Sequence, residues 1–192
     1  MKILSTIIIL LFPLTLLCQT LPYAELPVYS DEYSAGKVAA RAVDGLGFRF
    51  HWATDELRET DLAFKPGPEA RTSLETAAHI YEMSFIILNA VKKKVNVDGQ
   101  DAKVPFPEMR KKTLENLKAA SDVLMKSTDA EMKNYKALFN RNGKTVEIPF
   151  WNIINGPIED CVWHVGQIVS FRRSSGNPIN EKVNVFMGTV RK

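Results

Sequence analysis

Three side chains of this sequence have the types and the spacing to hold a metal ion: His79, Asp160 and His164. Asp160 and His164 are four residues apart, so on an α-helix they lie one above the other on the same face. Their stripe borders a broad apolar face, which places both polar groups at the edge of the core. His79 shares a helical stripe with apolar residues such as Ile86. Two imidazoles and one carboxylate from two helices would form a ligand set for a divalent ion.

Three protein ligands leave coordination positions open, as in a catalytic ion site. Zinc, nickel, manganese and ferrous iron all accept this set, so the sequence does not choose among them. Glu75, one helical turn before His79, is a candidate acceptor for that ring or a general base. His51 is an alternative ligand, a proton-transfer group or a core residue beside Trp52. Without a metal, the three side chains of the cluster would have to satisfy one another in poorly solvated surroundings.

Cys161 offers a thiol next to this cluster. It could be a nucleophile, but it lies on the apolar face of its helix, and free cysteines are usually buried as small hydrophobic residues. We therefore interpret it as structural. If Cys18 leaves with an N-terminal leader, Cys161 has no partner for an intramolecular disulfide and the fold must rest on its core.

The N-terminus predicts export. After Lys2, an apolar run of 16 residues extends from Ile3 to Cys18 and is interrupted by Pro13. This run is short for a membrane span, which needs about 20 residues, and is typical of a secretory signal. We interpret residues 1–18 as a signal peptide, which leaves no transmembrane span after processing. The alternatives are acylation of Cys18, although Leu17 stands where a small residue is expected, and an uncleaved anchor.

The elements that must position the cluster are mainly helical. The apolar periodicity predicts a first helix over about 30–57, and "TSLE" at 72–75 is a capping box that opens a second helix to about Lys93. Pro107 begins a third helix, and a last helix covers about 151–173, kinked at Gly156-Pro157. Asn142-Gly143 predicts a small hairpin-like insert. We expect an all-α fold: a four-helix bundle with long crossover loops, over residues 31–180, followed by a tail at 181–192.

Length and charge limit the class of protein. At 192 residues, the chain most simply forms one domain with a substantial core. Its 25 basic and 22 acidic residues give a net charge of only +3, without the concentrated basic face that nucleic-acid binding requires. The one dense basic run, at 92–94, closes a helix, where it offsets the C-terminal dipole.

The chain resembles the DinB/YfiT-like superfamily of metalloenzymes, which is unrelated to the DNA polymerase that shares the DinB name. The similarity covers about residues 35–180. Its main motifs are "LETAAHIYEM" around His79 and "CVWHVGQIVSFRRSSGNP" around His164. "FRFHWATDELRETDLAFKPGPEAR" matches the helix and turn that usually precede the second helix.

This resemblance implies a four-helix bundle with a divalent-metal site of three histidines, one on the second helix and two spaced four apart on the last. His79 and His164 match two of these positions. Asp160 stands at the third, so the usual H-x-x-x-H becomes D-x-x-x-H, which shifts the preference toward harder cations. Some members are thiol S-transferases whose metal activates a low-molecular-weight thiol, and many have no known activity. An export signal fits the transferase function poorly because such thiols are chiefly cytosolic.

These observations predict an exported, divalent-metal-dependent enzyme of hydrolase or transferase type that acts on a small molecule. The alternative is a non-catalytic exported bundle that binds a ligand or has a purely structural role. Bundles of this kind often pair through exposed helix faces, so a homodimer is an open alternative.

Overall fold

The computed structural model describes residues 20–28, 30–97 and 103–192 of the chain. The signal peptide expected at residues 1–18, and the alternative acylation of Cys18, lie outside these residues. None of the helices in the described ranges is both long and apolar enough to cross a membrane.

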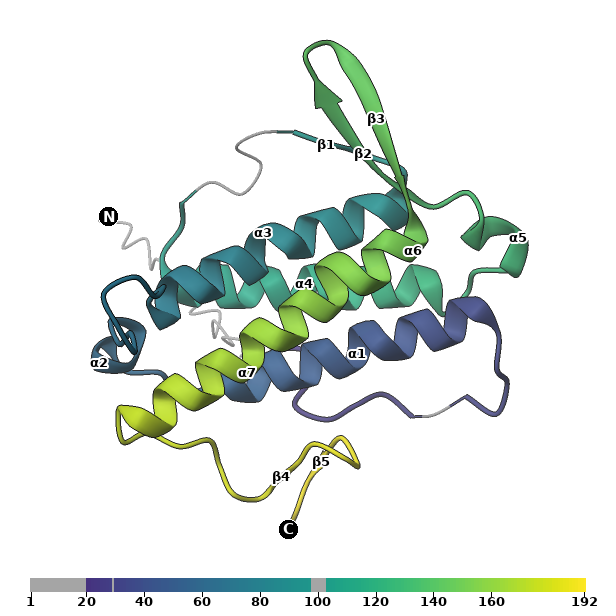
Figure 1. Ribbon diagram of the computed structural model, residues 1–192. Coiled ribbons are helices and arrows are strands. Elements are labelled where there is room, and N and C mark those ends of the chain that lie inside the picture. Colours follow the sequence, from purple (N-terminus) through teal and green to yellow (C-terminus); the bar gives the residue numbers. More distant parts are fainter. Residues whose placement is uncertain (1–19, 29, 98–102) are drawn as a thin grey trace, which may run out of the picture.

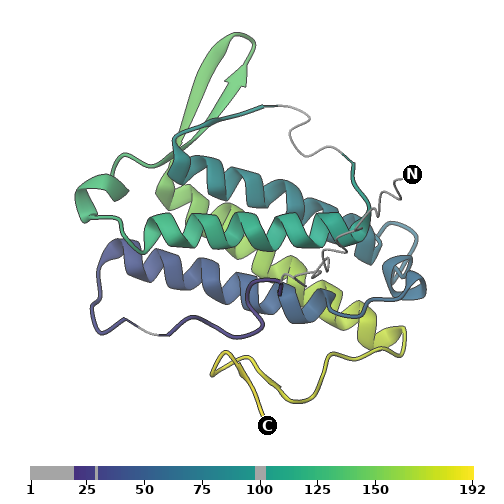
Figure 2. The same ribbon diagram turned by 180° about the vertical axis from the view of Figure 1, so that it is seen from behind.

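Four long helices form the body of the molecule: α1 (Ala35–Thr54), α3 (Ser73–Lys92), α4 (Phe106–Leu124) and α7 (Glu159–Ser174). These helices pack against one another in a closed ring: α1 on α4, α4 on α3, α3 on α7 and α7 on α1. Figures 1 and 2 show α7 on one side of this arrangement and α4 on the other. The core lies between them. Its largest fully buried side chains include Leu46, Phe48, Phe50, Ile80, Ile87, Leu114, Leu117, Leu124, Ile153 and Ile168.

Short helical elements connect or extend the long ones. They are α2 (Glu59–Leu62), α5 (Asp129–Met132), α6 (Phe150–Ile153) and a π-helical turn (Ile154–Ile158) that joins α6 to α7. The kink predicted at Gly156-Pro157 is confirmed. Gly156 has φ −95° and ψ −107°, outside the helical region, and Pro157 lies inside the π-helical turn.

The prediction of an all-α four-helix bundle is wrong. Five strands form two sheets within the described residues, so the fold is of a mixed α/β kind. The first sheet has the order β1-β2-β3, with β1 (Val95–Asn96) parallel to β2 (Lys136–Arg141) and β2 antiparallel to β3 (Lys144–Pro149). In Figure 1 this sheet projects beyond the ends of α3 and α6. The second sheet pairs β4 (Val183–Asn184) with β5 (Thr189–Val190).

The two sheets were not predicted from the sequence because three of their strands, β1, β4 and β5, are too short to show an alternation of apolar and polar residues. The hairpin around Asn142-Gly143 is present, but it is extended into a sheet by the two-residue strand β1. Side chains rather than strand length hold that strand: Asn89 Nδ2 donates to Asn96 Oδ1 at 2.9 Å, and Asn96 Nδ2 donates to the Leu138 carbonyl at 3.0 Å. A two-residue strand lies below the four to eight residues over which a period of two becomes visible.

The predicted start of the second helix is confirmed. Thr72 Oγ1 accepts from the Glu75 backbone N–H at 3.1 Å, and Glu75 Oε2 accepts from the Thr72 N–H at 2.7 Å. The first helix is shorter than predicted, because Ser34 rather than Ser30 is its N-cap, with its side chain accepting from the Lys37 N–H.

Two arginines satisfy the carbonyls at the C-terminal end of α1. Arg172 of α7 is 3% exposed and donates from Nη1 to the carbonyls of Trp52, Ala53 and Asp55 at 2.9–3.1 Å. Arg110 of α4 donates to the His51 carbonyl at 3.1 Å. The last carbonyls of a helix lack partners within the helix. These bonds therefore fix α1 against both α4 and α7.

The segment before α1 is also part of the packed structure. Tyr23 is 5% exposed, and its hydroxyl donates to Asp44 Oδ1 of α1 at 3.0 Å. Its ring lies over Gly47, where a Cβ atom would come within 2.4 Å of the ring carbons. Glycine at position 47 therefore permits this close contact between the segment and the helix.

Candidate metal centre

The cluster expected from the sequence forms where α3 packs against α7. His79 projects from the second turn of α3, and Asp160 and His164 project from the first two turns of α7. One ligand atom from each of the three residues can be chosen such that all lie within 4.8 Å of one another. The structure therefore brings together all three residues of the predicted ligand set.

The Nε2 atoms of both rings face the same carboxylate oxygen. His79 Nε2 lies 3.0 Å from Asp160 Oδ2, and His164 Nε2 lies 3.4 Å from the same atom. The two rings are perpendicular, with their centroids 4.8 Å apart. Two ligands of a tetrahedral ion at about 2.0–2.1 Å are about 3.3–3.4 Å apart. The two nitrogen–oxygen separations, 3.0 and 3.4 Å, are therefore close to those that a small divalent ion requires, and all three ligand atoms lie within 4.8 Å of one another.

The opposite nitrogen of each ring faces an acceptor from its own helix. His164 Nδ1 lies 2.8 Å from Gln167 Oε1, and His79 Nδ1 lies 3.8 Å from Glu82 Oε2. An amide oxygen only accepts, so Nδ1 is the donor in this contact, and in the neutral ring with this tautomer the lone pair lies on Nε2. Metal-binding histidines commonly have such an acceptor on their second nitrogen.

The π-helical turn before α7 helps to determine which residues face α3. A π turn inserts an extra residue into the helical repeat, and each residue of an α-helix advances the face by about 100°. Asp160 lies at the second position of α7, directly after this turn. π-helical turns inside α-helices frequently occur at functional sites.

The cluster is accessible from solvent. The side chains of His79, Asp160 and His164 are 22%, 38% and 15% exposed, respectively. A bound ion would therefore keep a side open to water or to a small ligand. A hollow of about 650 Å³ between α3 and the start of α4 is lined in part by Glu82, the residue that faces His79 Nδ1.

The two predicted proton-transfer residues have other partners. Glu75 Oε2 accepts from the backbone and hydroxyl of Thr72, and these bonds lower the pKa of its carboxyl. His51 Nδ1 hydrogen-bonds to the Pro22 carbonyl at 2.7 Å, and burial lowers the pKa of its ring. Among the described contacts, neither residue makes a hydrogen bond to the cluster. Their positions suit a helix cap and an anchor for the N-terminal segment, respectively.

Sequence analysis missed the role of Glu82 beside His79. A signal was present, because Glu82 follows His79 by three residues just as Gln167 follows His164 by three. On a helix, residues three apart are neighbours on the surface. The same spacing on both helices therefore places an oxygen acceptor near the second nitrogen of each ring.

Cys161 lies on the face of α7 that points into the core. Its side chain is 0% exposed, and burial, with a smaller contribution from the Asp160 charge, raises the pKa of its thiol. Nucleophilic cysteines require a lowered pKa and access. These properties support its interpretation as a structural residue.

Comparison of the chain with models of protein families, with curated proteins and with solved structures finds no match. The resemblance to the DinB/YfiT-like superfamily therefore stays a prediction, carried by the sequence motifs around His79 and His164.

Proposed function

We propose that the protein binds one divalent metal ion through His79, Asp160 and His164 and is a metal-dependent enzyme of hydrolase or transferase type. The observation that carries the proposal is the convergence of His79 Nε2 and His164 Nε2 on Asp160 Oδ2, at 3.0 and 3.4 Å. The contact of His164 Nδ1 with Gln167 Oε1 at 2.8 Å supports it, because this contact orients the His164 ring with Nε2 toward the common centre. Glu82 Oε2 lies on the corresponding side of the His79 ring, 3.8 Å from Nδ1.

The donor set suits zinc, nickel, manganese or ferrous iron. A divalent ion bound by these residues supplies Lewis acidity, which polarises a carbonyl or phosphoryl oxygen or lowers the pKa of a bound water or thiol. The protein's own contribution is to orient the His164 ring through Gln167, to place the Glu82 carboxylate near the His79 ring and to leave one side open to solvent. The competing account is a metal-free cluster, in which His79 Nε2–H donates to Asp160 Oδ2.

The substrate in this proposal is a small molecule. The hollow of about 650 Å³ is within the range of small-molecule sites, and Glu82 is common to it and to the surroundings of His79. The balanced charge of the chain, with 25 basic and 22 acidic residues, argues against a nucleic-acid substrate. We also propose that the protein acts outside the cytoplasm, on the basis of the apolar run from Ile3 to Cys18.

Zinc-dependent stability tests the ligand set. A ligand that binds the folded state alone stabilises it by about 2.7 kcal/mol at 100 times its Kd. Excess Zn²⁺ should therefore raise the melting temperature of the wild type, and it should have almost no effect on His79→Ala or His164→Ala. His51→Ala is the matched control, since it also removes an imidazole but should keep the zinc response.

The reaction can be tested with an activated ester such as p-nitrophenyl acetate. The zinc-loaded wild type and His51→Ala should hydrolyse it faster than buffer containing the same zinc concentration. His164→Ala and chelator-treated protein should not. Zinc binding without such activity, and without thiol transfer to an electrophile, would support the non-catalytic alternative.

A further inference from the structure

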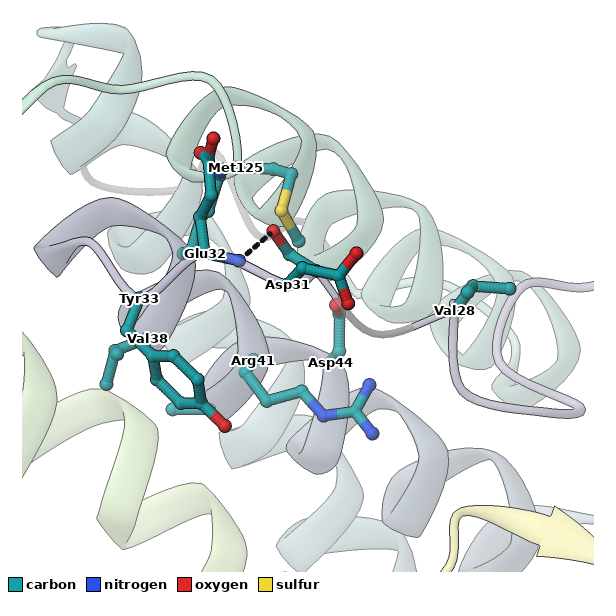
Figure 3. A pocket seen from close by; sticks show the side chains of 11 residues that line it. Val28, Asp31, Glu32, Tyr33, Val38, Arg41, Asp44 and Met125 are labelled. Carbon is teal, nitrogen blue, oxygen red and sulfur yellow. Dashed lines mark hydrogen bonds and ion pairs between the residues drawn. The ribbon is translucent and has the colours of Figure 1, made fainter.

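A second hollow lies where α1, the end of α4 and the segment before α1 meet. It has a volume of about 570 Å³, and Figure 3 shows its lining. Val38 and Ala42 of α1, Tyr33 of the preceding segment and Met125 at the end of α4 supply apolar surface. This volume is within the range of small-molecule sites, about 300–1,000 Å³.

Asp44 is the unusual residue of this pocket. It lines the hollow although it is only 1% exposed, and Tyr23 donates to its Oδ1 atom at 3.0 Å. Its Oδ2 atom is buried and has no hydrogen-bond partner among the described residues. A buried polar atom without a partner costs about 1–3 kcal/mol, and more when it is charged. A ligand that donates to Oδ2 would remove this cost.

The charges of the lining favour a cation. The described lining contains three carboxylates, Asp31, Glu32 and Asp44, against two cationic side chains, Lys37 and Arg41. Glu32 and Lys37 form an ion pair with each other. In Figure 3, Asp31 and Asp44 are drawn at the centre of the pocket and Arg41 at its lower side. When Asp44 is ionised, the pocket therefore has a surplus of one negative charge, and Asp44 is the most buried charged group of the lining.

We propose that this pocket binds a small organic amine, whose ammonium group donates a hydrogen bond to Asp44 Oδ2. The apolar part of the amine packs against Val38, Ala42 and Met125. An ammonium group both fills the vacant acceptor and neutralises a carboxylate that burial disfavours. This site is independent of the metal proposed at His79, Asp160 and His164, because the two sites share no residue.

The competing account is that the Asp44 carboxyl is purely structural. In that case, the hydroxyls of Tyr23 and Ser121 are its hydrogen-bond partners, and the raised pKa of the carboxyl follows from its burial alone. A structural carboxyl gives no selectivity between a charged and a neutral ligand of the same shape. Binding of an alkylamine and of the alcohol of equal length therefore separates the two accounts.

The experiment titrates the full chain with n-pentylammonium chloride and with 1-pentanol and follows binding by calorimetry and by NMR shifts of pocket residues. We expect saturable 1:1 binding of the amine and at least tenfold weaker binding of the alcohol. Asp44→Asn preserves the shape of the side chain and should weaken amine binding at least tenfold. The control Asp122→Asn makes the same change on the exposed side of α4, outside this pocket, and should leave it unchanged.

A second variant tests the pocket without changing a buried residue. Ala42 is exposed on α1, so Ala42→Phe should keep the fold and block the pocket, and amine binding should be lost. His164→Ala should bind the amine as the wild type does, which separates this test from that of the metal site. The proposal is overturned if the amine does not saturate a site, if the alcohol binds equally well, or if Asp44→Asn binds the amine with unchanged affinity.

Discussion

At the scale of single residues, the cluster depends on how each imidazole is oriented. Gln167 is within hydrogen-bond distance of His164 Nδ1 at 2.8 Å, whereas Glu82 lies 3.8 Å from His79 Nδ1, beyond that distance. The two acceptors occupy equivalent positions three residues after each histidine, but only one makes a direct bond. Their contributions to metal affinity should therefore differ.

Replacing Gln167 with Ala should reduce zinc affinity about 10–100-fold, because the acceptor that orients a metal-binding ring is lost. Glu82→Ala should have a smaller effect, since no direct hydrogen bond is broken. Competition titration with a chromogenic chelator measures both affinities. Equal affinities for Gln167→Ala and the wild type would show that the amide does not orient the ring.

The buried thiol of Cys161 makes a second residue-scale prediction. Cys161→Ala should lower the free energy of unfolding by about 1 kcal/mol or somewhat more through lost packing, with metal content unchanged. Urea denaturation and elemental analysis measure the two quantities. Native-state labelling of Cys161 by a thiol reagent, located by mass spectrometry, should be slow; rapid labelling would contradict its buried position.

Asp44 makes a prediction about pH. Burial raises the pKa of its carboxyl in the folded state more than its neighbours lower it. These neighbours are the hydroxyls of Ser121 and Tyr23 and the cations of Arg41 and Lys118. Stability from a carboxyl whose folded pKa is raised is fully present below the unfolded pKa, about 3.9, and is lost as the pH rises through the folded pKa.

The side chain introduced by Asp44→Asn cannot ionise, so this variant does not lose stability as the pH rises through the folded pKa of Asp44. The melting temperature of Asp44→Asn minus that of the wild type should therefore increase as the pH rises from 4 to 8, in the absence of added amine. Melting curves across this range measure the difference, and titration of the other carboxyls largely cancels between the two proteins. A difference that does not change with pH would mean that Asp44 has no raised pKa.

At the scale of elements, Arg172 is the residue that joins α7 to the end of α1. Its guanidinium donates to three backbone carbonyls of α1 and its cap, and its Nε donates to the Asn177 carbonyl at 2.6 Å. α7 carries two of the three residues of the cluster, so the position of this helix matters to the site. The loss of these bonds should affect both stability and metal binding.

Arg172→Ala should therefore lower the free energy of unfolding by about 3 kcal/mol, because several buried carbonyls lose a charged donor. Arg172→Lys should restore little, since an ammonium group cannot reproduce the planar fork of donors. Arg173→Ala is the matched control: Arg173 is the next residue and is exposed, so its loss should cost no more than about 0.5 kcal/mol. Similar losses for the two alanine variants would contradict the proposed role of Arg172.

The elements also show what could be predicted from the sequence. The second helix was predictable because Thr72 and Glu75 form a local capping box, and the kink at Gly156-Pro157 because both residues disfavour a regular helix. The strand β1 was not predictable, because its two residues are held by tertiary contacts from Asn89 and by pairing with β2. Local signals determine helix ends, whereas the sheets depend on contacts between distant segments.

At the scale of the whole molecule, the site was predictable only in part. The stacking of Asp160 and His164 follows from their spacing on one helix. Their meeting with His79, 81 residues before Asp160, depends on the packing of α3 against α7 and on the phase that the π-helical turn gives to α7. His51 and Glu75 carry suitable groups, but Pro22 and Thr72, respectively, hold them in other contacts.

The two candidate sites in the described part of the chain differ in kind. At the α3–α7 contact, three side chains converge and are open to solvent. At the α1–α4 pocket, a single carboxyl is buried and one of its oxygens has no hydrogen-bond partner among the described residues. The first arrangement suits a metal ion and the second suits an ammonium group.

The most direct test of the central claim is a crystal structure of the zinc-treated protein with anomalous data collected at the zinc edge. We predict one strong anomalous peak per chain between α3 and α7, with His79 Nε2, His164 Nε2 and an oxygen of Asp160 each about 2.0–2.2 Å from it. The absence of a peak at this position, with His79 Nε2 still hydrogen-bonded to Asp160 Oδ2, would contradict the claim and leave the cluster as a structural His–Asp contact.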